Sequence, residues 1–154
     1  MTIHFSDEQD DPLEPEPLIA LAQQVLAGEG FDAGAEVSVA LVSPDRMAQL
    51  NATYMGRSGP TDVLAFPLES LQPGEVIRSE PGGPPVGLGD VFIAPVVVRD
   101  NALEHGATFE DEMSLMVAHG ILHLVGYDHE DDGDAELMES REKALLAAAG
   151  GMRR

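Results

Sequence analysis

One short segment, residues 119–129, constrains the fold of this chain more than any other. It reads HGILHLVGYDH and holds three of the five histidines. If the segment is helical, His119 and His123 lie on one face, because they are four residues apart. Gly126 can adopt a positive φ, so the helix can end there and the chain can turn back. This turn brings His129 to the same point. Three neutral imidazoles at one point form a divalent-metal site with room for water or substrate, as in catalytic zinc sites.

There are two alternatives to an open metal site in this segment. The histidines could be packed core residues, or they could belong to a closed structural metal site. A lone histidine on an apolar helix face is usually a core residue, but three at this spacing favour a metal site. A closed structural zinc site needs a fourth ligand, often cysteine. The chain contains no cysteine, so Asp128 and Glu130 are the side chains that could close the site. Three imidazoles also suit nickel, copper or iron, and the identity of the metal stays open.

The histidine spacing is similar to that of the metzincin proteases, which read His-Glu-x-x-His-x-x-Gly-x-x-His. Gly120 stands where those proteases have the glutamate. Peptide hydrolysis needs that carboxylate to move a proton from the metal-bound water to the leaving amine. A glycine cannot do this, so the pattern favours a reaction with a better leaving group, such as phosphodiester cleavage. A metallopeptidase that uses another base is kept as an alternative.

Three segments together resemble one known family. They are HGILHLVGYDH at residues 119–129, LNATYMGRSGPTDVLAFPLE at residues 50–69 and LGDVFIAP at residues 88–95. In these segments, which occur in the family's order, the chain resembles the YbeY family of bacterial rRNA maturation endoribonucleases. The resemblance covers about residues 36 to 147.

This resemblance implies a zinc-dependent endoribonuclease that prefers single-stranded RNA. Family members act in processing the 3′ end of 16S ribosomal RNA and in ribosome quality control, so the implied partners are ribosomal RNA and ribosomal small-subunit proteins. The implied ligands of one Zn²⁺ are His119, His123 and His129. Many members have an arginine directly after the tyrosine of residues 50–69. Here Met55 follows that tyrosine and the nearest cation is Arg57, which is therefore our candidate catalytic residue. A non-catalytic ribosome-assembly factor with a structural metal is the remaining alternative.

Length and composition limit these interpretations. A chain of 154 residues suits one domain, which we expect to span residues 1–154. The lack of cysteine fits the reducing cytoplasm. The N-terminal residues do not show the pattern of a secretory signal. No apolar run approaches the roughly 18 residues that a membrane helix needs. We therefore expect a cytoplasmic protein that does not enter a membrane.

Charge is the main observation against an RNA enzyme. The net charge is −20, with eight basic residues against 28 acidic ones. Affinity for nucleic acids generally comes from lysine and arginine, so we expect weak binding to free RNA. Acidic residues concentrate at 7–16 and 130–142, which we expect to be solvated and far from the site. The cations expected on an RNA-facing surface are Arg46, Arg57, Arg78 and Arg99.

Hydrophobic periodicity and turn residues predict an α+β fold, with a four-stranded mixed sheet packed against helices. Strands are expected at 2–5, 36–42, 62–66 and 90–94, and helices at 17–26, 44–54, 95–105, 109–125 and 134–149. Residues 71–85, rich in glycine and proline, are expected to form a loop. Gly150 and Gly151 are expected to end the last helix. Apolar residues surround most of the helix at 109–125, so this metal-binding helix should lie in the centre of the domain.

Overall fold

A mixed four-stranded sheet organises the fold in a computed structural model that describes residues 1–150. The strand order is β1-β2-β4-β3, in which β1, β2 and β4 run parallel and β3 is antiparallel to β4. The strands are β1 (Thr2–Asp7), β2 (Ala35–Leu41), β3 (Val63–Pro67) and β4 (Val86–Ile93). Within the described residues, the helices are α1 (Pro15–Gly28), α2 (Pro44–Leu50), α3 (Pro95–His105), α4 (Phe109–Leu124) and α5 (Asp132–Ala148), with one π-helical turn, η1 (Asn51–Met55), after α2. The predicted α+β fold is confirmed.

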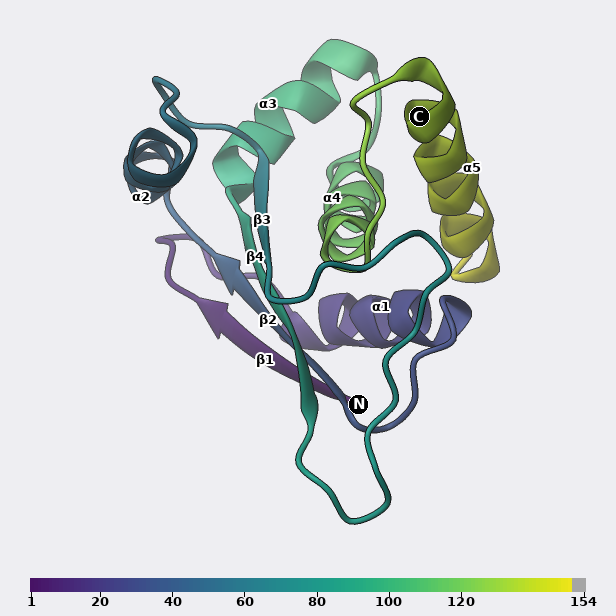
Figure 1. Cartoon of the computed structure of the whole chain (residues 1–154). Helices are drawn as coiled ribbons and strands as arrows, with labels where there is room; N and C mark the ends of the chain where they lie inside the picture. Colours follow the sequence, from purple (N-terminus) through teal and green to yellow (C-terminus); the bar gives the residue numbers. More distant parts are fainter. Residues whose placement is uncertain (151–154) are drawn as a thin grey trace.

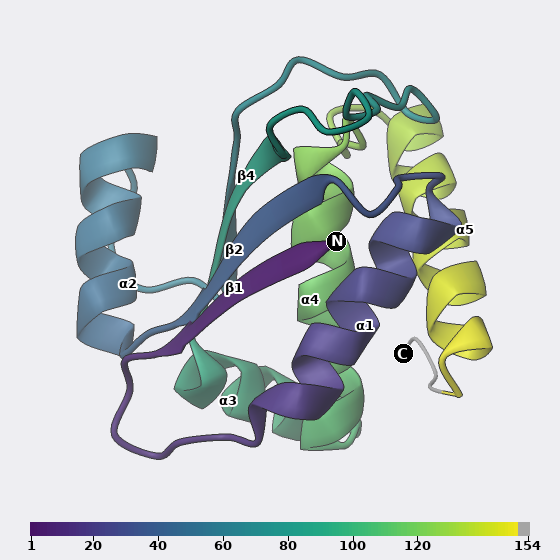
Figure 2. The ribbon, with the colours of Figure 1, turned by 90° about the horizontal axis from the view of Figure 1, so that it is seen from below.

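Helix α4 lies in the middle of the molecule. It packs against β3 and β4 on one side and against α1, α3 and α5 on the others (Figure 1). Helix α2 covers the opposite face of the sheet, as the view from below shows (Figure 2). The predicted central position of α4 is confirmed by its buried residues, which are Glu112, Met113, Leu115, Met116, Val117, Ala118, Gly120, Ile121, Leu122 and Leu124.

The ends of α4 follow from local chemistry. The Thr108 side chain accepts a hydrogen bond from the Asp111 backbone N–H at 3.1 Å, which caps the first turn. Three acidic residues in that turn, at positions 110–112, are stabilised by the positive end of the helix dipole. After Leu124 the chain turns through Gly126, whose φ is 109°. The cap at Thr108 and the turn at Gly126 therefore fix where α4 begins and where the chain leaves it before His129.

Several element boundaries differ from the sequence prediction: β1 ends at Asp7 and not at residue 5, α5 begins at Asp132 and not at residue 134, and the predicted helix 44–54 divides into α2 and η1. The starts of β4 and α1 differ for local reasons. Strand β4 begins at Val86 and not at residue 90, because a bulge opposite Glu36 and Val37 absorbs the extra residue Leu88. Helix α1 begins at Pro15 and not at residue 17. Proline is tolerated in the first helical turn, where its missing N–H would have no helical partner.

The remaining sequence predictions agree closely with the structure. Residues 71–85 contain no helix or strand, as expected for a loop. Gly150 follows α5 with a φ of 84°, whereas Gly151 lies outside the described residues. Among residues 1–150, no helix combines the length and the apolar character needed to cross a bilayer.

Candidate metal centre

The three histidines of residues 119–129 converge as the spacing predicted. His119 and His123 project from the last turns of α4, and His129 follows the turn at Gly126. One nitrogen from each ring lies within 4.8 Å of the other two, and the Nε2 atoms of His119 and His123 are 3.0 Å apart. Nitrogens about 2.0–2.1 Å from a tetrahedral zinc ion are about 3.3 Å from one another. The three rings can therefore hold a divalent ion with only small adjustments.

Hydrogen bonds on the far side of two rings orient them toward this point. His119 Nδ1 donates to the Glu142 carboxylate at 2.7 Å, and His123 Nδ1 donates to the backbone carbonyl of Tyr127 at 3.0 Å. Because a carbonyl and an ionised carboxylate only accept, each Nδ1 carries the proton. Both Nε2 atoms are then left with a lone pair for a metal, the arrangement that outer partners of metal-binding histidines usually impose.

Burial keeps His123 in the state that binds metals. Desolvation of the ring, with the neighbouring His119 and His129, lowers the pKa of His123 from 6.5 to about 4. The ring is therefore neutral at pH 7 in the metal-free protein. A neutral imidazole is the form whose nitrogen coordinates a cation.

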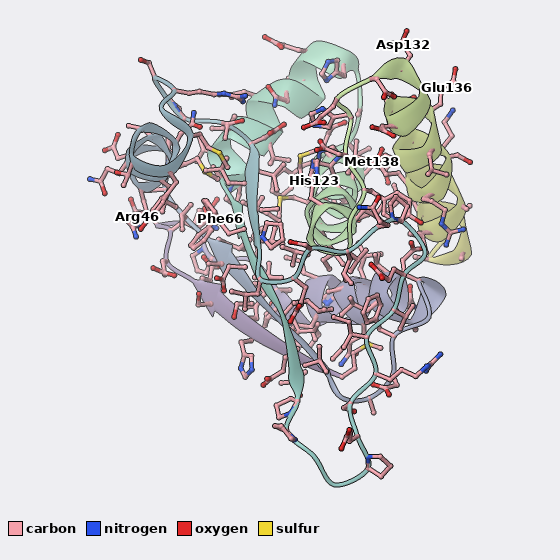
Figure 3. The ribbon with its side chains drawn as sticks, in the orientation of Figure 1. Arg46, Phe66, His123, Asp132, Glu136 and Met138 are labelled. Carbon is pink, nitrogen blue, oxygen red and sulfur yellow. The ribbon has the colours of Figure 1, made fainter. Side chains whose placement is uncertain are left out.

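Glu142 belongs to the candidate site through its contact with His119, and sequence reasoning missed it. It falls in the acidic block at 130–142, which was predicted to be solvated and far from the site. The prediction is wrong for Glu142, of which only 1% is exposed, and for Glu130, which lines the same cavity as the histidines. Glu142 shares the buried face of α5 with Met138 and Leu145. A carboxylate at helical spacing within an apolar stripe was the available signal. Asp132 and Glu136 of the same block do point outward, while Met138 faces α4 and His123 (Figure 3).

The histidines border an open cavity of about 970 Å³. Asp128 and Glu130, the two residues considered for closing the site, line this cavity. Neither belongs to the candidate metal cluster, which contains no carboxylate within residues 1–150. Asp128 instead accepts a hydrogen bond from the backbone N–H of His129 at 2.8 Å, the role of a turn residue. This geometry favours a site that is open to a substrate.

Arg57 lines the same cavity as the three histidines. Its loop is held in place because buried Asn51 donates through Nδ2 to the carbonyl of Gly59 at 2.9 Å. Met55, where the resemblance implies an arginine, lines the cavity as well. Sequence reasoning grouped four arginines on one surface, but the other three, Arg46, Arg78 and Arg99, do not line this cavity.

Gly120 has no room for the side chain that a metzincin protease would place there. A Cβ atom at this position would lie 2.5 Å from Val91 Cγ1 and 3.3 Å from Val63 Cγ2. The residue therefore faces the contact between α4 and the sheet. The sequence shows that the peptidase base is missing, and the structure shows that the packing of α4 on the sheet excludes it.

This packing makes Gly120→Glu an informative variant. We expect it to lower the free energy of unfolding by more than about 3 kcal/mol, because overpacking adds to the burial of an unpaired carboxylate. Urea unfolding measures this loss, with Gly133→Glu as the control because Gly133 is exposed in the first turn of α5. We expect no cleavage of an unstructured protein by Gly120→Glu. Chelator-sensitive cleavage by a folded variant would contradict this interpretation.

Comparison with known proteins identifies the family. The family profile described as Endoribonuclease YbeY matches residues 4–150. The chain belongs to the YbeY endoribonuclease family. Proteins named Endoribonuclease YbeY from Thermobifida fusca and Acidothermus cellulolyticus are 42% and 38% identical to it, over 96% of this chain and 93% and 91% of theirs. A solution structure of TM1509 from Thermotoga maritima has a TM-score of 0.65 and 32% identity, covering 96% of this chain and 88% of that one. The YbeY resemblance predicted from three motifs is confirmed.

Proposed function

We propose that this YbeY-family protein is a zinc-dependent endoribonuclease that cleaves single-stranded RNA. Its proposed role is maturation of the 3′ end of 16S ribosomal RNA and ribosome quality control, in the cytoplasm and on or near the ribosomal small subunit. Residues 1–154 are proposed to act as one catalytic domain. The observation that carries the proposal is the convergence of His119, His123 and His129 beside an open cavity.

The chemistry of the donor set fits Zn²⁺. Three nitrogen ligands with no carboxylate in the cluster, among residues 1–150, match the protein ligands of open catalytic zinc sites. When bound, such an ion supplies Lewis-acid stabilisation of the negative charge that develops on a phosphodiester. The protein contributes rigidity, since α4 is buried and the rings of His119 and His123 are already oriented by hydrogen bonds. This arrangement reduces the reorganisation needed during the reaction.

Arg57 is proposed to contact the scissile phosphate. Its guanidinium is permanently charged and presents planar donors that match a phosphate. The cavity that it shares with the histidines supports this role. Arg57 is proposed to take the role of the arginine that the family has at the position of Met55, because Arg57, two residues further along the chain, lines the same cavity.

We expect Arg57→Ala to lower the efficiency of RNA cleavage by about tenfold to a hundredfold, since a hydrogen bond to a charged group contributes about 1.5–3 kcal/mol. The slope of log affinity against log salt should fall by about 0.7, the value for one phosphate contact in single strands. Single-turnover cleavage and RNA binding at several salt concentrations measure the two effects. Arg46→Ala is the matched control because Arg46 lies on α2, away from His123 (Figure 3). Equal effects of both substitutions would exclude a specific role for Arg57.

The proposal is tested by metal analysis combined with an RNA cleavage assay on the same preparation. About one zinc ion per chain and cleavage of single-stranded RNA that a chelator abolishes are the expected results. Bound zinc without any cleavage would favour the assembly-factor alternative. The packing around Gly120 argues against the metallopeptidase alternative, because it leaves no room for a glutamate at this position.

A further inference from the structure

Glu29 lies at the end of α1, about 90 residues before the histidines in sequence. Its carboxylate is buried. Only 4% of its side chain is exposed. Its Oε2 accepts a hydrogen bond from Arg141 Nε at 2.9 Å, and the Tyr127 side chain lies beside the same carboxylate. One carboxylate thus joins three segments, namely the end of α1, the turn after α4 and the middle of α5.

Of the two partners of Glu29, Tyr127 contacts a metal-centre imidazole, and Arg141 is the sequence neighbour of a residue that does. Tyr127 provides the carbonyl that accepts from His123 Nδ1 at 3.0 Å. Arg141 immediately precedes Glu142, whose carboxylate accepts from His119 Nδ1 at 2.7 Å. Glu29 is therefore one residue contact away from Tyr127 and from the neighbour of Glu142, the two residues that orient the helical histidines.

We propose that Glu29 is a positioning residue for the metal centre, acting on His123 through Tyr127 and on His119 through Arg141 and Glu142. This inference rests on the metal site of the proposed function. It assigns to α1, which contributes no ligand, a part in fixing the ligand geometry.

Burial explains why Glu29 has this influence. Removing a buried carboxylate leaves the Arg141 guanidinium without its charge partner, which strongly favours movement of that side chain toward water. Arg141 and Glu142 are adjacent in α5, and we expect a rearrangement of Arg141 to disturb this part of the helix and with it the acceptor of the His119 ring. Direct outer partners of metal-binding histidines contribute about tenfold to a hundredfold in metal affinity. For Glu29, one contact further out, we expect the lower end of this range.

The experiment uses the full chain and two variants, Glu29→Gln and Tyr127→Phe. Glu29→Gln keeps the size of the side chain and removes its charge, while Tyr127→Phe removes the hydroxyl and keeps the carbonyl that binds His123. The dissociation constant of Zn²⁺ is measured by competition with a coloured chelator. The visible absorption of the Co²⁺-substituted protein is recorded at saturating Co²⁺. Glu36→Gln is the matched control, because Glu36 pairs with His4 at 2.6 Å on the sheet, away from the metal centre.

We expect Glu29→Gln to raise the dissociation constant of Zn²⁺ about tenfold and Tyr127→Phe by a smaller factor. Both should change the Co²⁺ spectrum, which reports ligand geometry and does not respond to a general loss of stability. Glu36→Gln should match the wild type in both measurements. Wild-type affinity and spectrum in the folded variants would overturn the inference and leave the proposed function intact. If Glu29→Gln does not fold, Tyr127→Phe alone decides. A wild-type protein that binds no Zn²⁺ would overturn both proposals.

Discussion

Replacing His123 with alanine should remove bound zinc and RNA cleavage together. His123 supplies one of three candidate ligand nitrogens, and its ring is already oriented and neutral. Without it, two imidazoles remain, fewer than the three protein ligands of catalytic zinc sites. We expect cleavage of single-stranded RNA to slow by at least about a hundredfold, as for the loss of a main electrostatic stabiliser of a transition state. Metal content and single-turnover rate are measured on the same sample.

A matched substitution separates this effect from a trace of contaminating nuclease. His105→Ala, purified in the same way, removes an exposed histidine in the last turn of α3 and should retain both zinc and activity. Equal cleavage by His123→Ala and the wild type would show that the activity does not belong to this site. Zinc retained in His123→Ala would exclude His123 as a ligand.

Because the protein is strongly acidic, we expect a metal ion at the histidines to contribute more to RNA binding than is usual for a nuclease. Arg57 shares the cavity lining with several carboxylates, which are those of Asp62, Glu69, Asp128 and Glu130. A surface of this kind offers little counterion release, the main source of affinity for nucleic acids. A divalent cation at the histidines would be the strongest positive charge in the cavity. The expectation of weak binding to free RNA therefore follows from the site as well as from the net charge, and we expect this binding to depend only slightly on salt.

The parts of the site that the sequence predicts are those that depend on local geometry. The four-residue spacing of His119 and His123 is a property of any helix, and Gly126 marks the turn that returns His129. Glu142 could not be assigned to His119 in this way. It is 23 residues distant and reaches the ring only because α5 packs on α4. Such a contact depends on how two helices pack, which the spacing within either one does not specify.

In the fold, too, the sequence predicts what local geometry determines and misses what depends on pairing with another element. The alternation of Val37, Val39 and Leu41 predicts β2 because burial on one face of a strand repeats every second residue. The first residues of β4 were missed because Gly87 and Gly89 suggest a loop when read alone. They belong to a strand because β2 pairs with them across a bulge.

Gly126→Ala should be the most destabilising single substitution in the site. The residue has a φ of 109°, and a Cβ there would lie 2.4 Å from the backbone oxygen of Leu71. Backbone atoms cannot move aside as a flexible side chain can. The turn must therefore open and carry His129 away from the other two histidines. We expect the free energy of unfolding to fall by about 4 kcal/mol or more, at the upper end for single substitutions. Urea unfolding in the presence of a chelator measures it.

Gly74→Ala separates the two causes of this loss. Gly74 has a φ of 86°, but nothing lies within 4 Å of a Cβ added to it. It should therefore cost only the conformational penalty of about 1–2 kcal/mol and leave zinc binding unchanged. The difference between the two variants measures the close approach of Leu71 to the turn. Equal losses would mean that the backbone conformation alone requires glycine at position 126, and that the loop at 71–85 does not help to hold His129 at the centre.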